Sequence, residues 1–362
     1  MYKVLVLLIA LVCSNCTACF ALDKNSEEYL RNKYLATKYI NRATELAYDG
    51  FYNLAFAKGE EAITYAKATK DKKILGTVYR DYADLYSHIN DRKNLTKYAE
   101  LAYAIDKNAW SGRYLSTVYE LNKDYENQIK IINSYINIEY ETLVPQAYSD
   151  RAEAYYHVGE YNKAIKNFTK TIQLENDSTT KFVYGCRIGD MYMLLGEYEK
   201  ALENYMEIKD LAEFRDSLEF INSKIARAYL QLGDMQKAAE YIKTAKNYDE
   251  NGMNYKEAQC ELFIYTGQCE KAVSLADEVE KARIDDSKYR QNYKIGEIDT
   301  ASKVREIIYF EHLNTIYYLQ GLAYFKLGNK EKALKYLRKS VRCNGEDSVL
   351  AKRLLNKISL EV

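Results

Sequence analysis

The sequence predicts an all-α protein, and three observations support this fold class. One proline and 15 glycines among 362 residues leave little material for the turns and loops of a β-rich fold. Apolar residues make up 48% of the chain and charged residues 29%, which suits soluble amphipathic helices. Similar helix-turn-helix patterns also recur along most of the chain, so its length need not mean two separate domains.

Charge is balanced over the whole chain. The 52 basic and 52 acidic side chains cancel, and the formal net charge is zero. A global field therefore cannot steer a ligand, and only local patches can do so. This balance does not favour nucleic acid as a partner.

The first 21 residues are typical of a secretory signal. Lys3 precedes the apolar run Val4–Val12, and small residues follow as far as Ala21. The run is too short to cross a hydrocarbon core of about 30 Å, which requires about 20 helical residues. We therefore exclude residues 1–21 from the fold, treat residues 22–35 as a lead-in, and expect an exported protein in the periplasm or at a bacterial cell envelope.

Two outcomes of cleavage remain open. Ala21, with the small Cys19 two residues earlier, suits ordinary signal peptidase, which would release a soluble protein. Thr17-Ala18-Cys19 instead resembles the end of a lipoprotein box, although Cys16 stands where leucine is usual. Lipidation of Cys19 would then attach the chain to a membrane through its N-terminus alone.

Four cysteines follow the signal segment: Cys186, Cys260, Cys269 and Cys343. They are too few for a disulfide framework, and each lies where a small apolar side chain packs well. We therefore expect single buried thiols, while a bridge between Cys260 and Cys269 in an oxidising compartment stays open.

The clearest repeated unit is Tyr148–Leu174. Apolar and small residues recur there at helical spacing on both sides of Gly159, which can adopt the left-handed conformation that ends a helix. The next copy repeats the pattern around Gly196. These units resemble the tetratricopeptide repeat, a helix-turn-helix motif of about 34 residues.

The resemblance implies a right-handed α-solenoid of about eight units over residues 36–343, closed by a capping helix at 344–362. In the unit around Lys123, Gln128 occupies the position where the family has a small residue. The turns between the paired helices are assigned to Gly50, Asn90, Lys123, Gly159, Gly196, Gly233, Gly267 and Gly328.

Small residues recur where the paired helices are expected to cross, because helices approach to about 8–10 Å only when one side of the contact is short. These positions are Ala55, Leu95, Ala164, Ala201, Ala238, Ala272 and Ala333, faced by Ala43, Ala83, Ala152, Gly189 and Ala226. Fifteen of the 37 tyrosines fall on the large-residue positions, and we assign them to packing: Tyr39, Tyr52, Tyr79, Tyr86, Tyr119, Tyr125, Tyr148, Tyr155, Tyr161, Tyr192, Tyr198, Tyr205, Tyr229, Tyr317 and Tyr324.

The last interval between turns is longer than the others and contains an insertion near residues 281–310. We expect a loop there, followed by an extended helix that begins at Asp299 or Thr300. The capping helix is expected to begin at Asp347 or Ser348.

Catalytic motifs are absent from the sequence. The chain has three histidines and no HExxH, GxxxxGK[ST], GxSxG or GxGxxG pattern. It therefore lacks the usual motifs of metalloproteases, P-loop enzymes, hydrolases with a nucleophile elbow and dinucleotide-binding enzymes. We therefore predict no enzyme activity, no cofactor and no metal site.

The family resemblance implies that the first helix of each unit lines a concave groove that holds a peptide or a partner helix. The two-carboxylate clamp of the family, a set of lysine and asparagine residues, is not reproduced. Thr117 stands four residues after Arg113, and Glu153 stands four residues after Ser149. The matching groove positions are Arg80, Asp84, Trp110, Arg113, Thr117, Glu120, Glu153, Tyr156, Arg187, Asp190, Met193, Arg227, Glu257 and Glu261.

The sequence therefore predicts a non-enzymatic protein-interaction scaffold of the cell envelope, with a protein or peptide as its ligand. The alternative is a glycan-binding or signal-sensing component of an envelope uptake or regulatory system. The sequence does not predict the oligomeric state.

Overall fold

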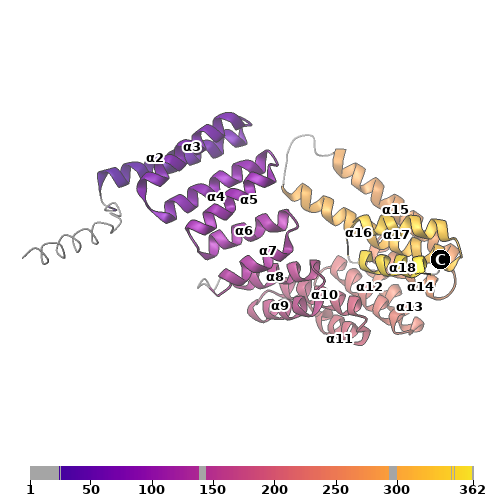
Figure 1. Ribbon diagram of the computed structural model, residues 1–362. Helices are drawn as coiled ribbons and strands as arrows, with labels where there is room; N and C mark the ends of the chain where they lie inside the picture. Colours follow the sequence, from indigo (N-terminus) through magenta and orange to yellow (C-terminus); the bar gives the residue numbers. More distant parts are fainter. Residues whose placement is uncertain are drawn as a thin grey trace, which may run out of the picture. The chain divides into compact units, whose positions relative to one another are not determined.

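The structure is a computed structural model, and its described part is entirely helical apart from turns (Figure 1). The predicted all-α class is confirmed. The predicted signal, residues 1–21 with Cys19, lies outside the described residues. These are residues 24, 26–137, 144–292, 300–343, 345 and 347–360, with the backbone alone described at 285–292 and 300–312.

The chain divides into two compact units, Met1–Gly159 (unit 1) and Glu160–Val362 (unit 2). The helices of unit 1 are α2 (Glu27–Tyr48), α3 (Tyr52–Thr69), α4 (Lys72–His88), α5 (Arg92–Ile105), α6 (Ala109–Leu121), α7 (Tyr125–Tyr135) and α8 (Val144–His157). Those of unit 2 are α9 (Tyr161–Leu174), α10 (Ser178–Leu195), α11 (Tyr198–Ile208), the 3₁₀ turn η2 (Lys209–Leu211), α12 (Arg215–Gln231), α13 (Met235–Tyr248), α14 (Met253–Tyr265), α15 (Cys269–Asn292), α16 (Thr300–Lys326), α17 (Lys330–Cys343) and α18 (Asp347–Leu360).

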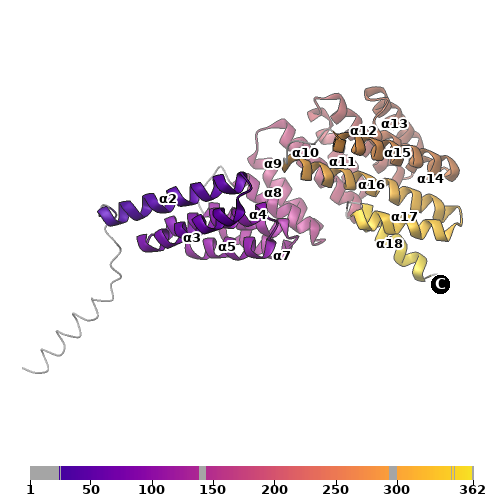
Figure 2. The same cartoon turned by 90° about the horizontal axis from the view of Figure 1, so that it is seen from above.

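Within each unit, consecutive helices pack as hairpins, and each hairpin packs on the next, as in an α-solenoid. Figure 1 shows α2 to α7 as successive layers of unit 1. Figure 2 shows α16, α17 and α18 following one another to the C-terminus of unit 2. The long α16 packs against both α17 and α18.

All eight predicted turn residues have the left-handed backbone conformation, with φ from 56° at Asn90 to 83° at Gly233. At Gly196 the amide donates to the carbonyl of Met193 at 3.1 Å, and the amide of Glu197 donates to the carbonyl of Tyr192 at 2.9 Å. This hydrogen-bond pair satisfies carbonyls that the end of a helix would otherwise leave unpaired. The predicted register of the helical hairpins is therefore confirmed.

Lys123→Gly is expected to raise the free energy of unfolding by about 0.5–1 kcal/mol. Lys123 has φ of 58°, and a side chain with a Cβ is strained in this conformation by about 1–2 kcal/mol. Glycine removes that strain but loses part of the gain to its greater freedom in the unfolded chain. Urea denaturation measures the change. Lys123→Ala is the matched control, because it keeps the Cβ and should give no gain.

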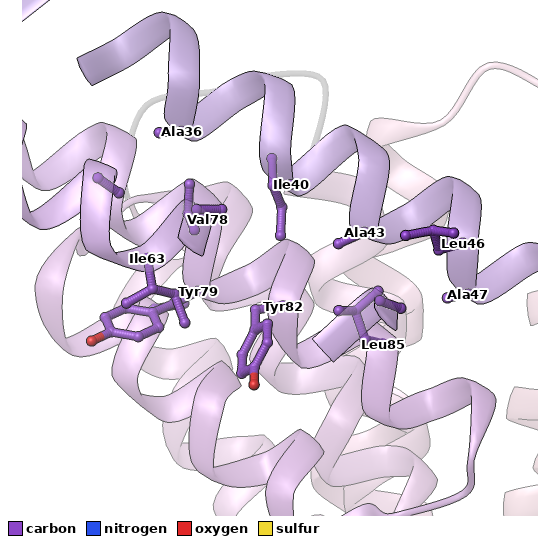
Figure 3. Close-up of a cluster of buried hydrophobic side chains, with 14 residues drawn as sticks. Ala36, Ile40, Ala43, Leu46, Ala47, Ile63, Val78, Tyr79, Tyr82 and Leu85 are labelled. Carbon is purple, nitrogen blue, oxygen red and sulfur yellow. The ribbon is translucent and has the colours of Figure 1, made fainter. Parts of the chain in front are cut away.

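Every small residue predicted at a helix crossing is buried. In unit 1, Figure 3 shows Ala36, Ile40 and Ala43 of α2 in the same apolar cluster as Val78 and Tyr82 of α4. The short side chains let these helices approach, and the neighbouring aromatic rings fill the remaining space.

Gln128 is the exception that the sequence pattern predicts. Its side chain is buried, and its Oε1 atom has no hydrogen-bond partner among the described residues. A buried amide at a small-residue position lowers the stability of the α6–α7 hairpin relative to an apolar side chain.

Two boundaries differ from the prediction. Helix α2 begins at Glu27, inside the expected lead-in 22–35, because Ser26 caps it by accepting from the amide of Tyr29 and acidic residues occupy its first turn. The expected loop near 281–310 is corrected up to residue 292, while residues 293–299 lie outside the described residues. Helix α15 continues to Asn292, since no glycine or proline interrupts it, and α16 begins at Thr300 as predicted.

Three of the four thiols, at Cys186, Cys260 and Cys269, are buried as predicted, whereas Cys343 is partly exposed. All four cysteines after the signal are free, so Cys260 and Cys269 form no bridge. Fourteen of the fifteen assigned tyrosines are at least partly buried, and Tyr52 is exposed. Several stack in pairs, for example Tyr229 on Tyr241 with ring centroids 5.5 Å apart.

Candidate functional site

The predicted groove residues lie on the first helices of the hairpins and form two sets. The unit 1 face, on α4, α6 and α8, comprises Arg80, Asp84, Trp110, Arg113, Thr117, Glu120, Glu153 and Tyr156. The unit 2 face, on α10, α12 and α14, comprises Arg187, Asp190, Met193, Arg227, Glu257 and Glu261. Their surroundings differ.

A hollow on the unit 1 face is lined by residues from the first helices of three hairpins, α2, α4 and α6. Arg80 and Asp84 lie in it, and Arg80 donates to the neighbouring Asp81 at 3.0 Å and 3.1 Å. The hollow is lined by Asn41, Thr44 and Glu45 of α2, Arg80, Asp81 and Asp84 of α4, and Tyr114 of α6.

Burial has the largest effect on the pKa values of the carboxyl groups on the unit 1 face. Burial raises the pKa of Asp81; Arg80 opposes that rise and Asp84 adds to it. Burial also raises the pKa of Asp150 on α8, and Glu153 adds to this rise. Since burial outweighs the arginines, an added cation beside these carboxylates would be stabilised.

Helix α6 adds an aromatic side chain to this face. Trp110, in its first turn, is 53% exposed, and Thr117 and Glu120 are exposed further along the helix. Arg113 is partly buried and lowers the pKa of Asp150, so the two side chains lie within electrostatic reach. A large exposed indole beside charged groups is the kind of residue that anchors a protein interface.

The unit 2 face is internally paired. Asp190 binds Lys224 Nζ at 2.7 Å, and its Oδ1 atom also accepts from the Tyr205 hydroxyl at 2.5 Å. Arg227 Nε lies 2.8 Å from Glu261. These predicted contact residues are therefore already bound within the protein.

Two partners of the unit 2 face come from segments far along the chain. Arg283, in the extended part of α15, binds Glu257 at 2.7 Å. Asp347, the first residue of α18, lies 3.2 Å from Arg227 Nη2. The sequence register places Glu257 and Arg227 on the correct helices, but it gives no information about these long-range partners.

Two hollows remain in the unit 2 face. The larger, about 300 Å³, lies on α10, α12, α14 and α16, and Arg187 and Glu257 are among its lining residues. The smaller, about 160 Å³, lies between Met193, Tyr318 and the first turn of α18 at Leu350. Asp190, Lys224 and Arg227 border both.

The sequence reasoning missed Asp81 and Asp150 of the unit 1 face and Lys224 of the unit 2 face. Asp150 precedes Glu153 by three residues, a spacing that places both on one side of a helix and could have identified it. Asp81 precedes Asp84, and Lys224 precedes Arg227, by the same three residues, so the same spacing could have identified both; it gives no information about the pairing of Lys224 with Asp190 of another helix.

The histidines are engaged by aromatic rings where their side chains are described. His88 contacts Tyr48 edge to face, and His157 stacks on Tyr125 with centroids 4.2 Å apart. Among the described residues, no three His, Cys, Asp or Glu side chains are grouped as metal ligands. No helix in the described ranges has the length and apolar character required to span a membrane.

The family models match three segments of unit 2. Two models described as the tetratricopeptide repeat match residues 186–214, 221–251 and 315–347. These segments contain the left-handed turns at Gly196, Gly233 and Gly328. No curated protein sequence matches the chain.

Solved structures with similar helix arrangements are distant in sequence. The apo form of the quorum sensor NprR from B. thuringiensis is 12% identical, with a TM-score of 0.49, and the match covers 86% of this chain and 88% of that one. A tetratricopeptide repeat protein from Parabacteroides merdae is 12% identical, with a TM-score of 0.47 and coverage of 68% and 93%. YrrB, a TPR protein with an unusual peptide-binding site, is 15% identical, with a TM-score of 0.43 and coverage of 55% and 97%. The repeat assignment therefore rests on the family models and the turn geometry.

Proposed function

The chain belongs to the tetratricopeptide repeat family, and we propose that it is a non-enzymatic scaffold that binds a segment of a partner protein on the unit 1 face. The observation that supports this choice is the contrast between its two faces. Trp110, Thr117 and Glu120 are exposed on unit 1, whereas Asp190, Arg227 and Glu261 of unit 2 are bound to other residues of the chain.

The partner segment that best fits the unit 1 face contains lysine or arginine next to an apolar residue. Burial raises the pKa values of Asp81 and Asp150, and a cation beside either carboxylate would relieve part of this cost. The exposed indole of Trp110 supplies apolar area for a neighbouring side chain.

Trp110→Ala is expected to weaken binding of a labelled Lys- and Arg-containing peptide at least ten-fold, since buried tryptophan anchors typically contribute 2 kcal/mol or more. Fluorescence anisotropy against a small peptide panel measures the affinity. Phe214→Ala is the control, because Phe214 is an exposed aromatic residue of unit 2. Equal binding by the wild type and Trp110→Ala, or a preference for acidic peptides, would contradict the proposal.

Binding of that peptide is also expected to weaken as pH falls toward 4. Asp81 and Asp150 must be ionised to attract a cation, and their pKa values lie above the ordinary value. The loss should therefore begin at a higher pH than for an unshifted aspartate. An Asp81→Asn, Asp150→Asn variant should bind more weakly at pH 7 and show a flatter pH profile.

We further propose that the scaffold works after export, in the periplasm or lipid-anchored at the envelope, because residues 1–21 have the pattern of a secretory signal. Mass spectrometry of the mature N-terminus tests this. Cleavage after Ala21 would support release, a lipid on Cys19 would support anchoring, and an intact Met1 would contradict export.

The glycan-binding alternative has less support, since most of the assigned tyrosines are packed within the fold.

A further inference from the structure

Helix α18 contacts two different parts of unit 2. Ala351 and Ile358 are buried with Leu337 of α17, as expected for a helix that caps the last hairpin. Asp347 and Arg353 point elsewhere: Asp347 pairs with Arg227 of α12, and Arg353 donates twice to the carbonyl of Leu194 in α10 at 3.1 Å. A cap needs only the first set of contacts, so the second set requires another explanation.

The second set lies on the face where the family resemblance places a ligand. Arg227 and Met193 are both predicted groove residues, and Leu350 of α18 borders the same hollow as Met193. Asp347, Leu350 and Arg353 follow one another at three-residue spacing along α18. This part of α18 therefore lies on the unit 2 face as a helical ligand would.

The balance of charged side chains indicates that the unit 2 face would accept a carboxylate from another helix. Four cations, Arg187, Lys224, Arg227 and Arg283, and four carboxylates, Asp190, Glu257, Glu261 and Asp347, surround its hollows or pair with residues that do. The two sets balance while Asp347 is in place. If the first turn of α18 moved away, one positive charge would be left, and a carboxylate from another helix would restore the balance.

The contact of α18 with α12 and α10 is made by polar side chains, whereas its contact with α17 is apolar. Arg227 Nε donates to Glu261 at 2.8 Å and Arg227 Nη2 donates to Asp347 at 3.2 Å, so Arg227 keeps one carboxylate partner when Asp347 leaves. A hollow of about 160 Å³ also remains beneath Leu350, where dispersion contacts are missing. Both features allow exchange of this contact without loss of the fold.

We propose that the unit 2 face is a second binding surface, for a helix with a carboxylate in its first turn and a leucine one turn later, and that α18 occupies it until such a partner displaces it. The face is then closed in the free protein. This surface is independent of the unit 1 face, so the failure of one proposal leaves the other standing.

The test uses the full chain and a labelled synthetic peptide that copies residues 345–360. Ile358→Ala weakens the anchor of α18 on α17 and leaves the unit 2 face unchanged. We expect this variant to bind the peptide at least ten-fold more tightly than the wild type. A peptide with asparagine in place of its aspartate should bind the variant at least five-fold more weakly. Leu360→Ala is the control, because Leu360 is 86% exposed, and it should behave as the wild type.

Equal affinity for the two peptides would overturn the proposal, because the peptide would then bind only to α16 and α17. Equal affinity of the wild type and Ile358→Ala, or no binding to either, would do the same. Hydrogen exchange on the wild type gives a second measurement that needs no variant. Amides of α18 should exchange at least ten-fold faster than those of α12, and excess peptide should accelerate them further. Equal protection of α18 and α12, unchanged by the peptide, would also overturn the proposal.

Discussion

Gly189→Ala is expected to lower the free energy of unfolding by roughly 2–6 kcal/mol, because the added methyl group collides with a buried ring. An alanine Cβ would lie 2.2 Å from Cε1 of Tyr205, which is fully buried. The ring is held in place, since its hydroxyl donates to Asp190, which also binds Lys224. Overpacking costs about 1–3 kcal/mol, and an unpaired buried polar group costs a similar amount. Denaturant unfolding measures the loss.

The control for this prediction is the double variant Gly189→Ala, Tyr205→Leu. The smaller leucine side chain makes room for the methyl group, so the two changes should cost less together than the sum of their separate costs. A double variant that is no more stable than the additive value would show that the collision with Tyr205 is not the cause.

The hairpins could be predicted because their signals are local. A residue with the left-handed backbone conformation follows the first helix of each hairpin, and six of these eight residues are glycine. Asn90 and Lys123 were found by spacing alone, and both have positive φ. The extension of α15 was not predicted, because a charged segment without glycine or proline fits a helix as well as a loop.

The helices that carry the predicted groove residues could be predicted, but the ion pairs of those residues could not. Register places Arg227 and Glu257 on first helices, and the structure agrees. Their partners Asp347 and Arg283 come from a capping helix and an extended helix, and no helical spacing rule connects residues so far apart. Long-range ion pairs depend on how several hairpins stack, which the pattern of one repeat does not contain.

Arg227→Met is expected to lower the free energy of unfolding by about 3–5 kcal/mol at pH 7, because it leaves buried carboxylates without their cation. The side chain of Arg227 is 16% exposed, and its partners Glu261 and Asp347 are only 4% and 7% exposed. Burial opposes its charge, yet Asp347 and Glu261 outweigh that effect and raise its pKa. Methionine has a similar length, so lost packing contributes little of the change.

The pH dependence separates lost charge from lost packing. Burial raises the pKa of Glu257, and Arg283 and Arg227 limit that rise, so the variant should raise this pKa further. A carboxyl group whose folded pKa exceeds its unfolded value, about 4.3 for glutamate, destabilises the fold above the folded pKa. The deficit of Arg227→Met should therefore shrink as pH falls toward 4.

Adding Glu261→Gln and Asp347→Asn should recover part of the stability at pH 7, because both buried charges disappear with their cation. A deficit that is the same at every pH and unaffected by these changes would mean that Arg227 acts through its hydrocarbon packing, and the charge balance inferred for the unit 2 face would then be wrong.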